Sequence, residues 1–244
     1  RLVGSEMCIR DRPNLASDKY GQLILKRDPI VDSVLKVDGE STRLETRPGD
    51  VQWLHPDSKQ LSVEYWVRPE SAKLGLIIGR DGGGVRIWKS GLYEVNINGK
   101  VQPVAFHEFF GGQGQGLFHA PNTPKAVLAL KQWHHVVMTY GGGKRHLYVN
   151  GDLAHSLDVT ADFLTGTAPL SIGSRSDDEE FFHGSIDNVA IYSRVLNSDE
   201  VTNHYQLHQK TKPQQSPQPV SPEFIAMVSL CHALICTNEF IYLD

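Results

Sequence analysis

Carboxylates and histidines, the side chains that most often carry acid–base chemistry, are spread along this sequence without a catalytic pairing. A retaining glycosidase needs two carboxyl groups about 5–5.5 Å apart, which a strand supplies with acids at nearby positions on one face. Glu64, Glu94 and Glu108 each stand alone. The only dense acidic run is Asp177–Glu180, and we expect it to be a solvated polar loop. No Gly-x-Ser-x-Gly motif occurs, so we predict that this segment is not catalytic.

Eleven histidines are present, and the adjacent pair His134 and His135 raises the question of metal binding. Neighbouring residues on a strand point to opposite faces, so this pair cannot readily chelate one ion. His135 shares its alternation face with Trp133 and Val137. We therefore expect His135 to be a packed and hydrogen-bonded residue.

A glycine-rich stretch at 107–119 carries side chains that suit a sugar ligand, because aromatic planes stack on sugar rings and amides bind hydroxyl groups. The candidate ligand-binding residues are Phe109, Phe110, Gln113, Gln115 and Phe118 of this stretch, with Trp88 and Tyr93 as a platform on neighbouring strands. The alternative is that the phenylalanines pack into the domain and the glycines only make a tight excursion.

Alternation of apolar and polar residues with a period of two identifies the elements that must position these side chains. It is clear at Leu61, Val63, Tyr65 and Val67, whose neighbours are mostly polar. Further strands are expected at 76–80, 84–89, 92–97, 101–106, 126–130, 134–140, 147–149, 170–173 and 185–192. Roughly ten or more short strands with frequent turn signals predict an all-β fold, an antiparallel sandwich or barrel.

Turn and cap signals add detail to this prediction. Asn98-Gly99 and Asn150-Gly151 lie between apolar runs and predict type I′ hairpins, whose two central residues both need a positive φ. Asn197 with Glu200 three residues later resembles a capping box, and it predicts one short helix that closes the domain.

Composition excludes some partners. A formal net charge of −4 gives no electrostatic footprint for nucleic acid or for an anionic membrane surface. The three cysteines lie at 8, 231 and 236, outside the central segment, so the core does not depend on disulfides or cysteine-bound metal.

The chain divides into four parts by composition. Residues 1–13 are expected to be a non-native leader, since 3–11 resembles a stray peptide found at the edges of metagenomic gene predictions. Residues 14–210 form the predicted β domain. Residues 211–223, rich in Pro, Gln and Ser, predict an extended linker. Residues 224–244 are too interrupted by polar groups for a membrane span and are expected to be a truncated next segment or a disordered tail.

Two blocks carry a family resemblance. The first is Trp-His-His-Val-Val-Met-Thr-Tyr at 133–140, followed by Leu-Tyr-Val-Asn-Gly at 147–151. The second is Gly-Ser-Ile-Asp-Asn-Val-Ala-Ile-Tyr-Ser-Arg-Val-Leu at 184–196. Both resemble the closing half of laminin-G-like or pentraxin-like domains of the concanavalin A-like superfamily. The resemblance implies a two-sheet jelly-roll sandwich with a short C-terminal helix. Asn188, Ala190 and Val37 depart from the family pattern.

The resemblance also implies one structural calcium ion beside the sheet. Asp187 would supply a carboxylate, and backbone oxygen near Asp38 and Gly39 would complete the site. The alternative is that Asp187 caps a turn or pairs with Arg194. A further alternative places calcium, and with it a sugar, at the acidic run Asp177–Glu180.

We therefore expect a non-catalytic recognition module of a secreted or cell-surface multidomain protein, with a glycan or an extracellular protein as its partner. Two alternatives remain. The module could be an accessory domain of a truncated glycoside hydrolase or other secreted enzyme, or it could be a structural spacer in an adhesion protein.

Overall fold

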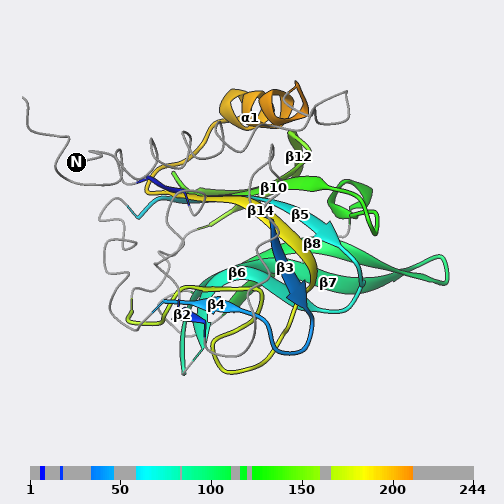
Figure 1. The fold of residues 1–244 in the computed structure, drawn as a ribbon. Helices are drawn as coiled ribbons and strands as arrows, with labels where there is room; N and C mark the ends of the chain where they lie inside the picture. Colours follow the sequence, from blue (N-terminus) through cyan, green and yellow to red (C-terminus); the bar gives the residue numbers. More distant parts are fainter. Residues whose placement is uncertain are drawn as a thin grey trace, which may run out of the picture.

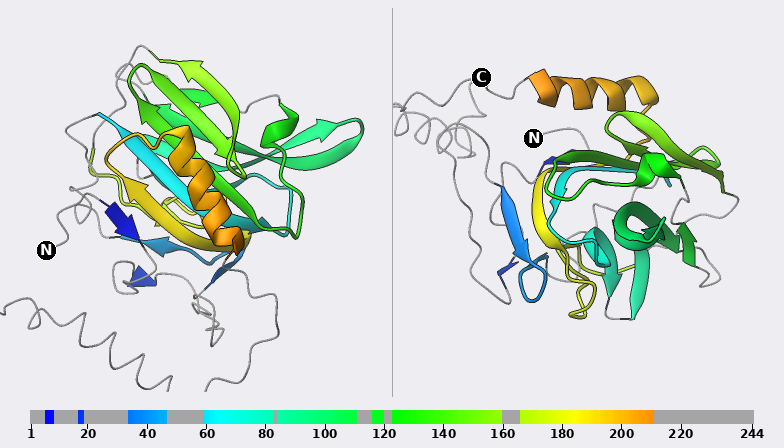
Figure 2. Two further views of the ribbon diagram at one scale, coloured as in Figure 1. Left: turned by 90° about the horizontal axis from the view of Figure 1, so that it is seen from above. Right: turned by 90° about the vertical axis from the view of Figure 1, so that its right-hand side faces the viewer.

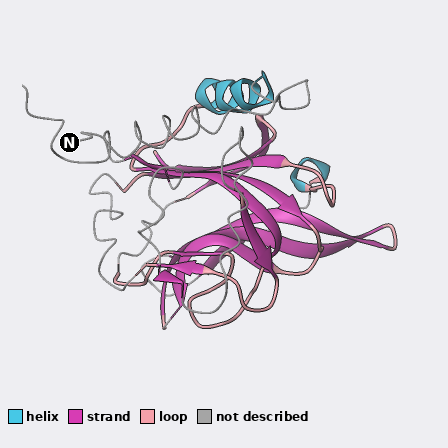
Figure 3. Ribbon diagram, viewed as in Figure 1, coloured by secondary structure: helices cyan, strands magenta, loops and turns pink. Residues whose placement is uncertain are grey.

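Two antiparallel β-sheets pack face to face, and one helix lies on the outside of one of them (Figures 1 and 3). The computed structural model describes residues 6–8, 17–18, 34–46, 59–82, 84–110, 116–119, 123–159 and 166–210. Within these residues the predicted class is confirmed, because the strands form two seven-stranded sheets with a single α-helix after the last strand.

Sheet A holds the strands that carry both family-like blocks. Its order is β1 (Glu6–Cys8), β14 (His183–Tyr192), β5 (Leu61–Pro69), β10 (His134–Gly141), β11 (Lys144–Val149) and β12 (Asp152–Asp158), with β3 (Leu35–Asp38) also paired to β14. The strands that are adjacent in space but distant in sequence, β14 and β5 above all, fix the jelly-roll connections.

Sheet B faces sheet A across the core. Its order is β2 (Ser17–Asp18), β4 (Leu44–Glu45), β13 (Ser171–Ile172), β6 (Gly75–Gly82), β7 (Val85–Ile97), β8 (Lys100–Phe110) and β9 (Gly116–His119). A 3₁₀ helix, η3 (Pro124–Ala126), precedes β10.

Alternation on both sheets builds one continuous core between them. Side chains of β5 such as Val63 and Tyr65 meet those of β7 and β8 such as Trp88 and Phe109, and all four are at most 1% exposed. The Tyr65 hydroxyl lies 2.8 Å from the Ser90 hydroxyl, so a hydrogen bond joins the two sheets inside this core. Buried polar groups need such partners.

Both predicted hairpins are confirmed. Asn98 and Gly99 join β7 to β8, and Asn150 and Gly151 join β11 to β12. The φ values of the four residues are 52°, 79°, 54° and 85°, the left-handed backbone that a type I′ turn requires. The β7–β8 hairpin projects beyond the body of the sandwich (Figure 1).

Helix α1 (Ser198–Lys210) lies across the outer face of sheet A (Figure 2). The predicted capping box is present: the Glu200 amide donates to Asn197 Oδ1 at 2.9 Å, and the Asn197 amide donates to Glu200 Oε2 at 2.9 Å. In the described residues, no helix is long and apolar enough to cross a membrane.

Three predicted elements differ from the structure. The strands expected at 84–89 and 92–97 are one strand, β7, because Gly91 does not break it; a side chain there would clash with the Gly75 carbonyl of β6. The strand expected at 126–130 is wrong: the chain there leaves η3 and makes only an isolated bridge between Val127 and Val104. The stretch 107–119, expected as a loop, contains the end of β8 and all of β9.

Candidate functional site

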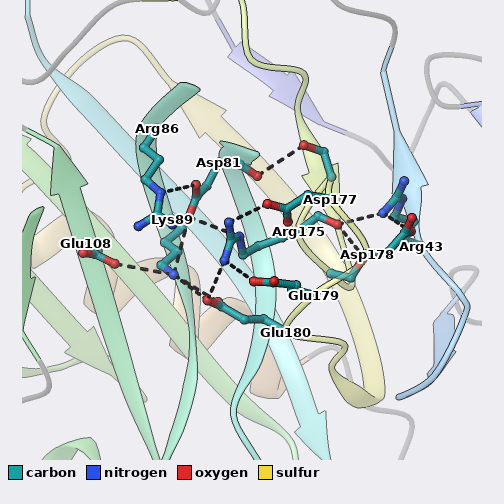
Figure 4. Close-up of polar contacts among 12 residues, drawn as sticks. Arg43, Asp81, Arg86, Lys89, Glu108, Arg175, Asp177, Asp178, Glu179 and Glu180 are labelled. Carbon is teal, nitrogen blue, oxygen red and sulfur yellow. Dashed lines mark hydrogen bonds and ion pairs between the residues drawn. The ribbon is translucent and has the colours of Figure 1, made fainter. Parts of the chain in front are cut away.

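The outer faces of the two sheets differ in what covers them. Helix α1 covers the outer face of sheet A. On sheet B, residues opposite in alternation to the core-facing Trp88 and Phe109 point outward, and among the described residues these include Lys89 and Glu108. A charged network occupies this outer face of sheet B (Figure 4).

Lys89 of β7 is the centre of this network. Its Nζ lies 2.8 Å from Glu180 Oε1, 3.4 Å from Asp81 Oδ2 and 3.5 Å from Glu108 Oε2. Arg175 approaches the same carboxylates, with Nε 3.7 Å from Asp81 Oδ2 and an Nη atom 3.5 Å from Glu180 Oε1. We call Asp81, Lys89, Glu108, Arg175 and Glu180 the Lys89 network.

Asp81 and Glu108 of the Lys89 network are buried, and their carboxylates lie beside cationic side chains. Asp81 is 0% exposed, and neither of its carboxylate oxygens has a hydrogen bond. Burial raises the pKa of Asp81 although Lys89, Arg175 and Arg86 act to lower it. Burial likewise raises the pKa of Glu108 against the opposing charge of Lys89. Both carboxylates therefore depend on the cations beside them.

A closed loop brings two of the network residues to the sheet. We call Gly173–Phe182 the acidic loop; the Phe182 amide donates to the Gly173 carbonyl at 2.8 Å and closes it. The Gly173 amide donates to the Ile77 carbonyl, which fixes the loop to β6. Within the loop, Arg175 donates to Asp177 at 2.6 Å and to Glu179 at 2.7 Å.

The far side of the acidic loop is anchored by Arg43, which follows β3 in the chain. Arg43 Nη1 donates to Asp178 Oδ1 at 2.7 Å and to the Arg175 carbonyl at 2.8 Å. Its other Nη atom lies 2.9 Å from Glu45 Oε2. The Arg43 side chain is 0% exposed, whereas that of Asp178 is 53% exposed. The buried Arg43 guanidinium thus anchors the acidic loop, while Asp178 of the loop remains accessible to solvent.

Aromatic rings lie beneath two of the cations. The Lys89 ammonium is 5.8 Å from the centre of the Phe106 ring, and the Arg86 guanidinium carbon is 5.6 Å from that of Phe110. These distances allow cation–π attraction. Arg86 also lies 3.5 Å from Asp81, and its side chain is 51% exposed, so it forms the solvent-facing cationic edge of the site.

Burial decides the outcome for three of the predicted ligand-binding aromatics. Trp88 is 1%, Phe109 0% and Phe110 4% exposed, so the packing alternative holds and the prediction that their rings contact a ligand is wrong. Tyr93 is partly buried and packs against the core. Gln113 and Gln115 lie outside the described residues, and for Phe118 only the backbone pairing with Glu108 is described, so these three stay predictions.

The predicted calcium ligands are not brought together. Asp38 is paired with His183, four residues before Asp187 on β14, which is roughly 13 Å along a strand. Calcium ligands lie only about 2.3–2.6 Å from the ion, so Asp187 cannot share one ion with Asp38 and Gly39, and this ligand set is wrong. Calcium binding as such stays a prediction.

Both aspartates have local roles instead. Asp38 Oδ1 accepts from the amides of Glu40, Ser41 and Thr42, each at 2.9 Å, and so holds the turn after β3. Partial burial acts to raise the pKa of Asp38, but the hydrogen bond from the Ser41 hydroxyl and those from the three amides hold it well below its usual range. Asp187 Oδ1 accepts from the Asn188 amide at 2.8 Å, as the turn-capping alternative expects. The carboxylates of the acidic loop are engaged by arginine and lysine.

The convergence of the Lys89 network is the feature that sequence reasoning missed. Its members come from β6, β7, β8 and the acidic loop, so no local spacing shows that they meet. One signal was available: Lys89 directly follows Ile87 and Trp88 in a stretch predicted to be a strand. A lysine inside such a strand is seldom buried unless it is paired.

Comparisons with known proteins agree with this architecture. The profile of the family described as Concanavalin A-like lectin/glucanases superfamily matches residues 38–202. No curated protein sequence matches the chain.

Similar solved structures include two toxin binding domains and one enzyme domain. The botulinum neurotoxin serotype G binding domain is 17% identical, with a TM-score of 0.58, over 83% of this chain and 49% of that one. The binding domain of botulinum neurotoxin DC in complex with SialylT is 15% identical, with a TM-score of 0.59, over 80% and 47%. Domain 4 of AbnA, a GH43 extracellular arabinanase from Geobacillus stearothermophilus, in complex with arabinotriose, is 19% identical, with a TM-score of 0.50, over 81% and 86%. The chain spans about half the length of the toxin domains, and at these identities the likeness shows the fold.

Proposed function

Since the chain belongs to the concanavalin A-like lectin/glucanase superfamily, we propose that it is a non-catalytic module that binds a neutral carbohydrate through the outer face of sheet B. The observation that carries this proposal is the Lys89 network with its exposed rim on the sheet face that α1 does not cover. Fold alone does not set function, so the proposal rests on these side chains.

The rim of the site can bind hydroxyl groups from several directions. The side chains of Arg86, Asp178 and Glu179 are 51%, 53% and 64% exposed, whereas those of Lys89 and Glu108 are 8% and 11% exposed. Sugar hydroxyls both donate and accept, and ionised partners make the stronger hydrogen bonds. A rim of mixed charge on a rigid sheet therefore suits a polar, uncharged ligand.

Charge supports a neutral ligand over an acidic one. Figure 4 labels six carboxylates (Asp81, Glu108, Asp177, Asp178, Glu179 and Glu180) and four cations (Arg43, Arg86, Lys89 and Arg175), a formal excess of two negative charges. Glu45, paired with Arg43, adds a third. An acidic glycan would meet like charge at the exposed part of this face.

The engagement of the carboxylates in the Lys89 network supports non-catalytic action. General acid–base chemistry needs a carboxyl group that is free to give or take a proton near the substrate. Asp81, Glu108 and Glu180 instead share the Lys89 ammonium, and Asp81 is fully buried. This arrangement favours binding over proton transfer.

A second proposal concerns the parent protein. The AbnA domain of similar fold is a domain of an extracellular arabinanase and was solved with arabinotriose, an uncharged sugar. It supports a secreted setting in which the present domain serves as the accessory module of an enzyme that acts on polysaccharides.

A glycan array tests the binding proposal with the full chain. It should carry neutral arabino-, xylo-, gluco- and galacto-oligosaccharides beside sialylated, uronic and sulfated ones, and be run with calcium and with a chelator. Arg86→Ala and Glu108→Gln change the site, and Lys144→Ala, on the hairpin between β10 and β11 in the other sheet, is the matched control.

We expect binding to neutral glycans that falls at least about tenfold in the two site variants, as for the loss of a charged hydrogen bond, and is unchanged in Lys144→Ala. Absence of binding to every glycan would contradict the function. Binding to acidic glycans alone would contradict the ligand class, and equal binding by Arg86→Ala and Glu108→Gln would contradict the assignment of the face.

A further inference from the structure

A buried carboxylate under helix α1 joins four elements. Glu64 projects from β5 on the outer face of sheet A, where its oxygens meet His135 Nε2 of β10 at 2.7 Å and the Tyr192 hydroxyl of β14 at 2.9 Å. His204 Nδ1 of α1 lies 3.1 and 3.0 Å from the two oxygens. The helix is therefore bound to the sheet at the centre of this cluster.

Among the described residues, α1 is also held by two side-chain hydrogen bonds, from Thr202 Oγ1 to the Gly151 carbonyl at 3.1 Å and between Asn188 Nδ2 and His208 Nδ1 at 3.3 Å, and by a small apolar contact. Its apolar contribution is one buried side chain, Val201, which packs with Val137, Tyr148 and Leu196 in a small cluster separate from the main core. Aromatic contacts add to it: the His208 ring lies 4.1 Å and the Tyr205 ring 5.8 Å from that of Trp66. Because this apolar cluster is small, the polar bond between His204 and Glu64 is a large part of the attachment.

The two histidines at Glu64 differ in exposure. The His135 side chain is 0% exposed, and its Nδ1 is buried with no hydrogen-bond partner. The His204 side chain is 35% exposed. Its Nδ1 faces both carboxylate oxygens, so a second proton is added at Nε2.

Among the described residues, the other titratable groups beside the cluster come from the helix end and from two strands. Glu200 of α1 raises the pKa of His204, and Arg194, which precedes the helix, lowers it. The two side chains pair with each other at 2.8 Å. From β10 and β14 the facing groups are His135 and Tyr192. Glu64 is thus the charge in direct contact with His204.

We propose that α1 is a pH-controlled latch: protonation of His204 fastens the helix to Glu64, and deprotonation loosens it and exposes the outer face of sheet A. The neutral imidazole still donates one hydrogen bond from Nδ1, so deprotonation weakens the attachment of the helix to sheet A but does not abolish it. The loosened state uncovers Trp66, now 4% exposed, together with Val137 and Tyr148.

The sign of the pH dependence follows from the titrating groups. The hydrogen bond to Glu64 raises the pKa of His204 above its ordinary 6.5 in spite of partial burial. The stabilisation is complete below 6.5 and is lost as pH rises through that raised value. Burial acts to raise the pKa of Glu64, but hydrogen bonds from His135 and His204 lower it from 4.5 to about 2. The latch is therefore strongest between roughly pH 4.5 and 6.5.

Hydrogen exchange of the helix amides tests the latch in the full chain. Exchange of peptides covering 198–210 would be followed by mass spectrometry at pH 6 and pH 9, with each rate divided by the intrinsic rate at that pH. A partly exposed charge-assisted bond corresponds to an opening constant about threefold to tenfold larger at pH 9. Peptides of β5 and β10 that face the core should show no such increase.

Variants assign the effect to one side chain. His204→Gln keeps a hydrogen-bond donor without the charge, so its opening constant at pH 6 should equal the native value at pH 9 and stay flat. His208→Gln, one turn later on the same helix, is the matched control: it loses the ring contact with Trp66, so its opening constant should rise equally at both pH values and keep the native pH dependence. A flat native profile, a pH step retained in His204→Gln, or a step abolished in His208→Gln would each overturn the proposal.

Discussion

Replacing Lys89 by methionine removes the central cation of the Lys89 network while keeping a side chain of similar length. In the native protein the Lys89 ammonium is within 3.5 Å of Asp81, Glu108 and Glu180, and its side chain is only 8% exposed. In Lys89→Met, Arg175 and Arg86 remain near Asp81, but Glu108 loses its cation. The variant therefore leaves buried negative charge that is poorly compensated.

The expected loss of stability is large for a single side chain. Removing one partner of a buried ion pair costs about 3–5 kcal/mol in the free energy of unfolding. That is a fifth or more of the roughly 5–15 kcal/mol that stabilises an ordinary domain. Burial already raises the pKa values of Asp81 and Glu108. Without Lys89 both acids bind protons more readily when folded, so the loss should be smaller at pH 5 than at pH 8.

Urea unfolding followed by circular dichroism at pH 5 and pH 8 measures this loss. Lys144→Met is the matched control, because Lys144 and Asp158 form a 2.7 Å pair with side chains 55% and 83% exposed. Exposed pairs contribute little, so Lys144→Met should unfold like the native chain. If Lys89→Met were as stable as Lys144→Met at pH 8, two conclusions would be refuted: that the Lys89 network is desolvated, and that it holds the acidic loop against sheet B.

Three further substitutions test other parts of the structure. Phe109→Ala should lower the free energy of unfolding by about 3–5 kcal/mol in urea, because the ring is fully buried and packs 4.6 Å from Tyr140; a loss under 1 kcal/mol would mean that Phe109 is not core. Asn197→Ala removes the cap shared with Glu200 and should cost about 1 kcal/mol in thermal unfolding, a value that an unchanged melting curve would contradict. Asp38→Ala should lower the melting temperature at pH 7, with the difference shrinking as pH falls below 3.8, because the pKa of Asp38 is lowered in the fold; a difference independent of pH would show that its carboxylate is not ionised in these hydrogen bonds.

Local signals in the sequence predicted the parts of the fold that local geometry determines. The Asn-Gly pairs at 98–99 and 150–151 specified hairpins because few residues adopt a positive φ at two successive positions. Asn197 and Glu200 specified the start of α1 because their side chains complete the first turn. Period-two alternation located β5, β10 and β14, because the backbone of a strand turns successive side chains to opposite faces.

The end of β8 was missed because its sequence resembles a loop. Phe109 and Phe110 are followed by two glycines, and such a pattern gives no alternation to mark a strand. Both faces of β8 are buried here, Phe109 toward the core and Phe110 beneath Arg86, so two adjacent aromatics are compatible with a strand. Burial on both faces depends on tertiary contacts that the local pattern does not contain.

The candidate site was missed for a related reason. Asp81, Glu108 and Arg175 are each unremarkable in their own stretch, and only the pairing of β6 with β7 and of β7 with β8 brings the first two to Lys89. The acidic run at 177–180 was recognised as a polar loop, but its attachment to Arg43 and Lys89 is a tertiary contact. The predicted calcium ligand set failed in the opposite way, because a family pattern joined Asp187 to Asp38 across a register that separates them, and calcium binding itself stays a prediction.

The most direct test of the central claim is where a bound glycan lies on the protein. Backbone amide chemical shifts of the full chain would be followed while a neutral oligosaccharide selected by the array is added. The largest shifts should fall in the acidic loop and around Arg86, Lys89 and Glu108, with none on α1. Shifts confined to α1, or to the hairpin at Asn98 and Gly99 at the far end of β7 and β8, would contradict the assignment of the binding site to the Lys89 network.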